Sequence, residues 1–330
     1  MKQAPRLAVT LGDPCGVGPE LLLKVLPAIA DRWLPTVYGS LAGLALLPPG
    51  GVDFEVREGR LALGPLEIPW VDPTPEVFRD SLKLGEPSAV SGRCAVEAVR
   101  SATLDVLADR QDALLTLPIS KAAAHMAGYD IPGHTELLQQ LTDSPTVRMS
   151  FVSPSLKVVL HTVHQSLRSA IEGLNAESVA ETLTFTAEQF AALLGLPQIR
   201  VALCALNPHA GECGAFGGEE ALLEESIKIA ADHFGGGASA APTFHGPCPA
   251  DTVFLRARRG EFDVVVALYH DQGLIPIKLV EPESAVNLTL GLPFVRVSPD
   301  HGTAFDIAGK WAADPRNTLA AAELAYSLQR

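Results

Sequence analysis

The sequence predicts an α/β protein in which largely parallel sheets carry helices on both faces. Short runs of β-branched and other apolar residues alternate along the chain with longer segments that show helical periodicity. Several of the short runs are apolar throughout, as buried parallel strands are, and they end directly in polar loops. At 330 residues, 47% of them hydrophobic, the chain can bury a large core, and this length favours two lobes over one.

The composition excludes several classes of partner. The chain has 25 basic and 38 acidic residues, a net charge of −13, and no run of Lys and Arg. Nucleic acid binding depends on clustered basic residues that neutralise phosphates, so we expect no nucleic acid partner. No apolar stretch approaches the ~20 residues that a membrane span needs, and the N-terminus does not resemble a signal peptide. Five scattered cysteines without a CxxC pair suit a reducing cytoplasm.

The first predicted strand, residues 7–11, ends in the turn GDPCGVGPE. Pro19 suits the first turn of the helix that follows. The glycine spacing departs from the GxGxxG of dinucleotide-binding turns, so we do not expect a conventional Rossmann site. A tight structural turn explains these glycines about as well as a ligand loop does. Further along, the pattern predicts strands at 36–38, 53–56 and 112–117, and helices at 91–108 and 136–141, the last with Thr135 as its N-cap.

The second half of the chain continues the alternation of strands and helices. The predicted strands are 148–152, 157–163, 201–206, 264–268 and 294–297, with shorter extended pieces at 275–280 and 286–290. The predicted helices start at Leu167 and cover 177–194 and 219–233, and two more helices follow a loop at 298–303. This order predicts parallel sheets with strand ends that gather polar loops on one edge.

Three histidines, His164, His209 and His270, each follow a β-rich apolar run. Ligands of open α/β sheets bind outside the carboxyl ends of the strands. Neutral imidazole binds zinc and other divalent transition metals well, and catalytic metal sites often use three protein ligands. A fold that gathers these strand ends could therefore build a metal site. An ordinary hydrogen-bonded role for each histidine remains open on the pattern alone, while His161, inside a predicted strand, is interpreted as a core residue.

A second group of polar residues suits an anion. Lys278 is flanked by apolar residues, and Arg296 lies inside a predicted strand not far from Asn287. A cation in such a place usually has an anion to meet, either a protein carboxylate or a ligand phosphate. His134 and Thr135 open a helix, where donors at the positive end of the helix dipole also suit an anion or serve as simple caps.

Seven motifs follow one another along the chain: TLGDPCGVGPE (10–20), LPISKAA (117–123), IPGHTELL (131–138), LNPHAGECGAFGGEE (206–220), GPCPADTVF (246–254), YHDQGLIPIK (269–278) and AVNLTLGLPFVRVSPDHGTAFDIAG (285–309). In this order they resemble the 4-hydroxythreonine-4-phosphate dehydrogenase family of vitamin B6 biosynthesis. Two positions depart from the family pattern. A proline is lost after His164, where Leu167 and Arg168 still hold the register, and Ala215 stands where a histidine is frequent.

The resemblance implies a set of site residues. One divalent ion (Zn, Mg, Mn or Co) would be held by His164, His209 and His270. Substrate-binding positions would be His134, Thr135, Lys278, Asn287 and Arg296. HGTAFDIAGK (301–310) resembles the loop by which isocitrate and isopropylmalate dehydrogenases hold the adenosine of NAD or NADP, which implies cofactor contacts from His301, Gly302, Thr303 and Asp306. Lys278, Asp251 or Asp271 would relay protons.

The resemblance also implies an architecture, the two-lobed α/β/α fold of the isocitrate and isopropylmalate dehydrogenases. One lobe would comprise residues 1–135 plus 285–330 and carry the cofactor loop. The other, residues 136–284, would carry the metal ligands and the dimer contacts. The active site would lie in the cleft between the lobes of a homodimer with shared active sites.

The implied activity is the NAD(P)-dependent oxidation of 4-phosphohydroxy-L-threonine. The resulting 3-keto acid would decarboxylate to 3-amino-2-oxopropyl phosphate, in the cytoplasm, on the route to pyridoxine 5′-phosphate. One alternative is a dehydrogenase of a sugar-acid phosphate such as threonate or erythronate 4-phosphate. Another is a non-redox phosphate acyltransferase, whose fold is similar.

Overall fold

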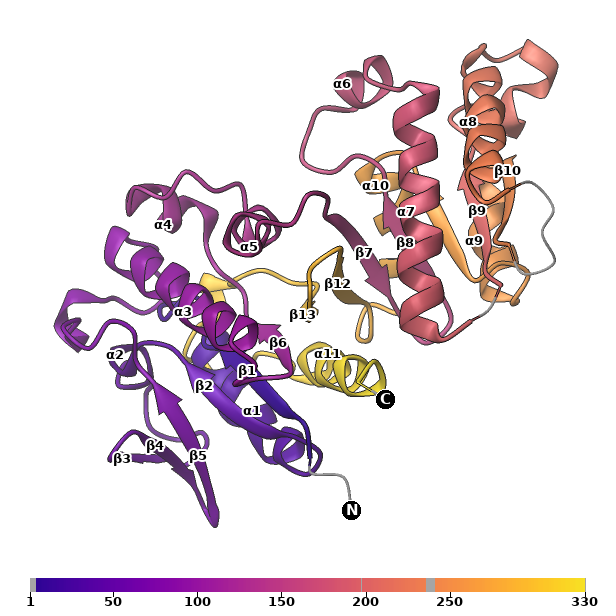
Figure 1. Ribbon diagram of the computed structural model, residues 1–330. Helices are drawn as coiled ribbons and strands as arrows, with labels where there is room; N and C mark the ends of the chain where they lie inside the picture. Colours follow the sequence, from indigo (N-terminus) through magenta and orange to yellow (C-terminus); the bar gives the residue numbers. More distant parts are fainter. Residues whose placement is uncertain (1–3, 197, 236–240, 330) are drawn as a thin grey trace. The chain divides into compact units, whose positions relative to one another are not determined.

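The chain forms two compact units (Figure 1). The computed structural model describes residues 4–196, 198–235 and 241–329. The first unit is Met1–Val147 with Val286–Arg330, and the second is Arg148–Ala285. The first unit extends beyond the lobe expected from the sequence, which ended at residue 135. The reason is that helix α5 (His134–Thr142) packs its buried leucines, Leu137 and Leu138, into the same core as helix α3 (Ala89–Leu107).

The first unit is built on a mostly parallel set of strands. In the order β12-β13-β6-β1-β2-β5-β4-β3, the β13/β6, β6/β1, β1/β2 and β2/β5 pairs are parallel, and the β12/β13, β5/β4 and β4/β3 pairs are antiparallel. The strands are β1 (Arg6–Thr10), β2 (Leu34–Tyr38), β3 (Glu55–Arg57), β4 (Arg60–Leu63), β5 (Leu66–Val71), β6 (Ala113–Thr116), β12 (Val286–Leu290) and β13 (Val295–Pro299). The remaining helices are α1 (Gly18–Ala30), α2 (Leu41–Leu44), α4 (Lys121–Met126), α11 (Arg316–Ser327) and the 3-10 turns η1 (Arg79–Ser81) and η3 (Phe305–Ile307).

Helices cover both faces of this sheet. Ala8 and Leu114 pack into one core with α3 and α5. The alternate residues on β1, Leu7 and Val9, are also fully buried, and α1 and α11 pack against each other and against β2, β6 and β13. Because successive side chains of a strand point to opposite faces, a strand buried at every position needs a helix layer on each side.

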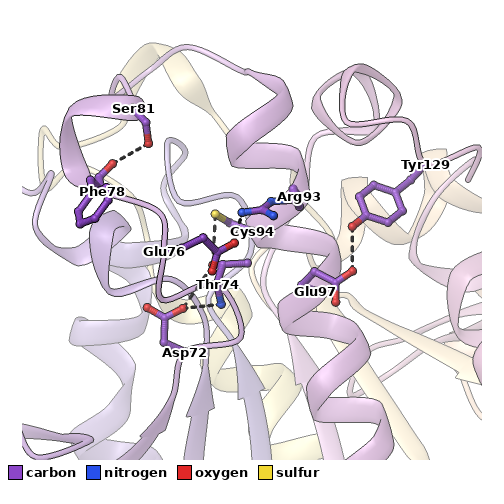
Figure 2. Close-up of polar contacts among 9 residues, drawn as sticks. All are labelled: Asp72, Thr74, Glu76, Phe78, Ser81, Arg93, Cys94, Glu97 and Tyr129. Carbon is purple, nitrogen blue, oxygen red and sulfur yellow. Dashed lines mark hydrogen bonds and ion pairs between the residues drawn. The ribbon is translucent and has the colours of Figure 1, made fainter.

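The segment that follows β5 is fastened to α3 by polar contacts (Figure 2). Thr74 donates its backbone N–H to Asp72 at 2.8 Å, and its hydroxyl lies 3.5 Å from the Cys94 sulfur. Arg93 forms an ion pair with Glu76. On the same helix, Glu97 accepts a 2.8 Å hydrogen bond from the Tyr129 hydroxyl. These contacts give α3 fixed neighbours on its polar side.

The second unit has its own α/β layer structure. Its strand order is β10-β9-β11-β8-β7, in which all neighbours are parallel except β8 and β7. The strands are β7 (Arg148–Val152), β8 (Lys157–Leu160), β9 (Arg200–Cys204), β10 (Thr243–Cys248) and β11 (Val264–Ala267). The helices are α6 (Leu167–Glu172), α7 (Ala176–Leu194), α8 (Glu219–His233), α9 (Ala250–Arg258), α10 (His270–Val280) and the short turn η2 (Pro208–Gly214).

The structure confirms the α/β class with largely parallel sheets and corrects several elements. Residues 275–280, predicted to be extended, form the second half of α10. A helix is needed there because it covers β8 and β11, and Gly273 lets it approach so closely that an added Cβ would lie 2.6 Å from Leu160. Gly133 rather than Thr135 is the N-cap of α5. The C-terminal part has one α-helix and one 3-10 turn in place of two helices.

Two further observations bear on the composition argument. All five cysteines lie in described parts of the chain and are free thiols. Among the described residues, no helix combines the length and apolar character required to traverse a bilayer.

The GDPCGVGPE turn is packed inside the first unit: the carboxylate of Asp13 accepts a 2.9 Å hydrogen bond from the Cys15 N–H. Burial raises the pKa of Asp13 to about 6.

Candidate active site

The three predicted metal ligands follow three neighbouring parallel strands of the second unit. His164 comes after β8, His270 directly after β11 and His209 after β9, and β11 lies between the other two strands. Since parallel strands place their carboxyl ends at the same edge of a sheet, the fold directs the three segments to one edge. The sequence predicted that the ends of these three strands lie close together, and the observed strand order agrees with that prediction.

Two of the three histidines line one pocket. The ring centroids of His164 and His270 are 6.3 Å apart. Together with Tyr269 and Asp271, they line a cavity of about 470 Å³. Asp271 Oδ1 lies 2.7 Å from Nδ1 of His270. A carboxylate on Nδ1 fixes the ring so that Nε2 carries the lone pair, which is the arrangement found in histidines that bind metals.

His209 lies on a left-handed turn. Five consecutive residues of η2, His209 to Cys213, have φ between 42° and 76°. Only glycine adopts this region without steric penalty, so a run with four non-glycine residues is strained and must be held by its surroundings. The holding groups are carboxylates: Glu220 accepts from the backbone N–H of Asn207 at 2.8 Å and from its amide at 3.0 Å. Strain of this kind is typical of functional loops.

The donor set fits a divalent metal, but the three imidazoles are not assembled into a ligand cluster. No group of three or more His, Cys, Asp or Glu side chains is close enough to hold a metal ion in the parts of the chain that the structure describes. The structure thus brings His164 and His270 together and leaves His209 outside the pocket that they line. Imidazole nitrogen with a carboxylate behind one ring is nevertheless donor chemistry suited to Zn²⁺ or a similar ion.

The residues predicted to relay protons have different surroundings. Asp271 is engaged with Nδ1 of His270. Asp251 is exposed in the first turn of α9, and Lys278 is exposed in the last turn of α10. Of the three, only Asp271 lies in the pocket with two of the histidines.

A buried cation lies in the first unit, where the sequence predicted an anion site. Arg296 on β13 is 1% exposed. It donates to the hydroxyls of Thr289 and Thr116 at 2.9 and 2.6 Å, and its Nε has no hydrogen-bond partner among the described residues. Burial lowers the pKa of Arg296 to about 9, against the opposing effect of Glu136. A desolvated guanidinium with hydroxyl partners favours a ligand that brings negative charge.

Other predicted substrate-binding residues lie around this cation. His134 begins α5, and its buried Nε2 has no hydrogen-bond partner in the described part of the chain. Desolvation, with Arg296 and Lys121 nearby, holds the pKa of His134 well below its usual value, so the ring is neutral. Thr135 is buried in the same turn. The buried Oδ1 of Asn287, on β12, likewise lacks a hydrogen-bond partner within the described residues.

Lys121 is the residue that the sequence argument missed. It begins α4, just after the loop that follows β6, and an added Cβ on Gly133 would lie 3.4 Å from its Cε. It therefore lies beside the first turn of α5 and adds positive charge next to His134. The motif LPISKAA could have revealed it, because its lysine follows a buried strand as closely as the histidines do.

The predicted cofactor loop is open to solvent. His301, Gly302 and Asp306 are exposed, and Thr303 is partly buried. An added Cβ on Gly302 would meet nothing within 4 Å, while one on Gly16 would lie 2.8 Å from the Thr303 carbonyl oxygen. The loop thus presents an exposed carboxylate, Asp306, and open backbone at Gly302.

Comparisons with known proteins agree over nearly the whole chain. A family model described as "Pyridoxal phosphate biosynthetic protein PdxA" matches residues 59–325. The D-threonate 4-phosphate dehydrogenase of Salmonella typhimurium is 39% identical over 98% of this chain and 98% of its own. The 4-hydroxythreonine-4-phosphate dehydrogenase of Bradyrhizobium diazoefficiens is 38% identical over 98% of this chain and 96% of its own. A solved structure, a 4-hydroxythreonine-4-phosphate dehydrogenase from Klebsiella pneumoniae, shares a TM-score of 0.82 and 35% identity, covering 99% of this chain and all of that one.

The fold, the site and these relatives define an α/β dehydrogenase. The predicted oxidoreductase class is confirmed. More narrowly, the chain belongs to the PdxA family, as the order of its sequence motifs predicted.

Proposed function

We propose that this dehydrogenase oxidises 4-phosphohydroxy-L-threonine with NAD or NADP and a divalent metal. The product would be a 3-keto acid that loses CO2 to give 3-amino-2-oxopropyl phosphate. The observation that carries the proposal is the buried Arg296, whose partners are two threonine hydroxyls and whose Nε is left without one among the described residues. A phosphorylated substrate supplies the anion that this guanidinium favours.

The proposal assigns binding roles to the chain's own residues. Arg296, His134 and Thr135, with Lys278 and Asn287, would bind the phosphate and carboxylate ends of the substrate. His134 is neutral, so it can donate one hydrogen bond without adding charge. Lys121 would add a positive charge beside the phosphate. His301, Gly302, Thr303 and Asp306 would hold the adenosine of the cofactor.

His164, His209 and His270 would hold the metal. When bound, a divalent ion lowers the pKa of an alcohol and stabilises the negative charge left by decarboxylation, while the nicotinamide accepts the hydride. Asp271 would keep the His270 ring in the tautomer that presents Nε2, which makes it a positioning residue. Asp251 and Lys278 remain candidates for moving the proton that the hydroxyl loses. We further propose a cytoplasmic homodimer with shared active sites, as the resemblance implies.

The test is the formation of NADH or NADPH at 340 nm from 4-phosphohydroxy-L-threonine, before and after treatment with a chelator. Turnover that the chelator abolishes and that added Zn²⁺, Mg²⁺, Mn²⁺ or Co²⁺ restores would support the proposal. The His209→Ala variant should lose turnover with its fold intact, and the exposed His233→Ala variant is the control. Full activity after exhaustive chelation would contradict the metal assignment.

A second candidate substrate is D-threonate 4-phosphate. It is favoured by relatives of equal similarity that carry that name. Both candidates are four-carbon acids with a phosphate at the far end, so the anion site fits either. Turnover of D-threonate 4-phosphate without turnover of the amino acid would keep the site and change the pathway.

A further inference from the structure

A fully buried carboxylate on α1 holds the backbone that comes after the candidate cofactor loop. Glu20 is 0% exposed. It accepts three backbone hydrogen bonds, from the N–H groups of Gly309, Trp311 and Ala313, at 3.0, 3.1 and 2.9 Å. Burying a carboxylate is unfavourable unless such donors surround it. We call residues 309–313 the strap.

A second α1 side chain binds the same strap through its carbonyls. Lys24 donates to the carbonyl oxygens of Trp311 and Ala313 at 2.8 and 2.7 Å. Residues four apart lie on one face of a helix, so Glu20 and Lys24 point to the same side of α1. Between them they bind both the N–H and C=O groups of the strap.

The start of α1 also fixes the other end of the cofactor loop. The N–H of Val17, the N-cap of α1, donates to the Thr303 carbonyl at 2.9 Å. Gly16 lies against the same carbonyl, since an added Cβ would come within 2.8 Å of its oxygen. The loop is therefore hydrogen-bonded to the start of α1 at Thr303 and again at Gly309.

The backbone is strained at Ala304, between these anchors, and at Trp311, within the strap. Ala304 and Trp311 have φ of 42° and 57°, and Gly309 has φ of 73°. A residue with a Cβ adopts this left-handed region only where its surroundings impose it. The Trp311 ring packs on Gly51, and its Nε1 donates to the Pro48 carbonyl at 3.2 Å. The Glu20 hydrogen bonds are among the contacts that hold the strap in this conformation.

We propose that Glu20 is a positioning residue that preorganises the cofactor loop for the nicotinamide dinucleotide by clamping the strap. The inference rests on the proposed function in one respect, namely that residues 301–306 bind the nucleotide. A loop that is already ordered loses less conformational entropy when a ligand binds, so it binds more tightly. Because Glu20 is fully buried, it acts through the strap and not on the nucleotide itself.

The test is Glu20→Gln. The amide has nearly the same shape, but its NH2 would face at least one N–H donor of the strap and leave it without an acceptor. We expect the Kd and KM for NAD+ to rise ten- to a hundredfold. The kcat at saturating NAD+ and the KM for the phosphorylated substrate should change less than threefold. A loss of stability alone would not produce this separation.

A second readout requires neither turnover nor nucleotide. Of the three tryptophans, Trp33 and Trp70 are 2% and 6% exposed, while Trp311 is only half-buried. Acrylamide quenching of tryptophan fluorescence therefore reports mainly on Trp311. Glu20→Gln should increase the quenching constant at least twofold in the unliganded protein.

If that variant does not fold, Lys24→Met should give the same changes with a smaller amplitude, about three- to tenfold in Kd.

Two further variants separate the possible failures. Asp112→Asn is the matched control: Asp112 accepts the Arg6 N–H at 2.7 Å at the start of β1, and its loss should reduce stability without changing the Kd for NAD+. Asp306→Ala tests the loop itself. If Asp306→Ala weakens NAD+ binding while Glu20→Gln and Lys24→Met leave both the Kd and the quenching unchanged, the inference about Glu20 is wrong. If Asp306→Ala has no effect either, the loop assignment in the proposed function is wrong.

Discussion

Arg296 places a guanidinium in the interior of the first unit, where its side chain is 1% exposed. Removing a charge from water is unfavourable, and its hydrogen bonds to Thr116 and Thr289 return only part of that free energy. A residue kept at such a cost is better explained by ligand binding than by stability. The neighbouring His134, held neutral by desolvation, fits the same interpretation.

Replacing Arg296 by methionine should therefore weaken phosphate binding without weakening the fold. We expect the KM for the phosphorylated substrate to rise about a hundredfold, because the charge-assisted hydrogen bonds are lost. Inorganic phosphate should raise the Tm of the natural protein, and Arg296→Met should lose that rise. The control is Arg200→Met, which removes a half-exposed ion pair with Asp263. An unchanged phosphate effect on the Tm of Arg296→Met would contradict the assignment.

His161 shows the opposite case, a histidine with a structural role. Its Nδ1 lies 2.8 Å from the Thr182 hydroxyl. Since Thr182 donates that hydroxyl's proton to the Ser178 carbonyl at 3.0 Å, Nδ1–H of His161 is the donor. Burial, aided by Arg148, lowers the pKa of His161 to about 4. The choice of His164 over His161 as the candidate ligand is favoured by the pocket, which His164 lines with His270 and His161 does not.

The low pKa of His161 predicts a pH dependence of stability. The folded protein keeps the ring neutral, whereas the unfolded chain takes up a proton below pH ~6.5. The stabilisation is therefore fully present above pH ~6.5 and is lost progressively as the pH falls towards 4, by at most about 3 kcal/mol. Urea unfolding of His161→Asn between pH 4 and 7 should show a smaller decline than the natural protein. Identical pH profiles would show that His161 titrates normally.

At the scale of elements, the candidate metal ligands come from the segments directly after three strands. β8, β11 and β9 are short and buried and apolar at their carboxyl ends, and the candidate side chains lie just beyond. The left-handed turn that carries His209 is the least regular of these connections. Glu219 and Glu220, at the start of α8, accept three hydrogen bonds from Asn207, just before this turn.

Glu220→Gln should loosen this turn and weaken metal binding. One of the two oxygens that accept from Asn207 becomes an NH2 group, so a donor in the turn loses its acceptor. We expect about tenfold weaker Co²⁺ binding, followed by visible absorbance, with a decrease in Tm of a few degrees. The exposed Glu224→Gln, on the same helix, should match the natural protein. Unchanged Co²⁺ affinity in Glu220→Gln would show that the turn does not position a ligand.

At the scale of the whole molecule, the sequence predicted the fold class well because its buried strands are apolar throughout and end abruptly. Hydrophobic periodicity predicted the wrong secondary structure where tertiary contacts determine it. Residues 275–280 contain Pro276 and looked extended, yet they continue a helix whose Gly273 packs on β8 and β11. β10 was missed because its sequence, TFHGPC, lacks an apolar run; in the described sheet it is an edge strand beside β9.

The candidate site was predictable in its chemistry and less so in its geometry. The three histidines stood out because each follows an apolar run, but their assignment as metal ligands came from the family resemblance; the strand order directs their segments to one edge of the sheet. The left-handed turn at His209 and the Glu20 clamp could not be foreseen, because both depend on contacts between residues distant along the chain or on backbone angles that no residue pattern encodes. Lys121 was overlooked although its motif was recognised.

The identity of the substrate is the central claim, and a competition experiment tests it most directly. The metal-loaded enzyme would be given NAD+ with equal, subsaturating concentrations of 4-phosphohydroxy-L-threonine and D-threonate 4-phosphate, and the consumption of each followed by mass spectrometry. We predict that the amino acid is consumed at least tenfold faster, with one CO2 and one NADH released per molecule. Preferential consumption of D-threonate 4-phosphate, or consumption of neither, would contradict the account.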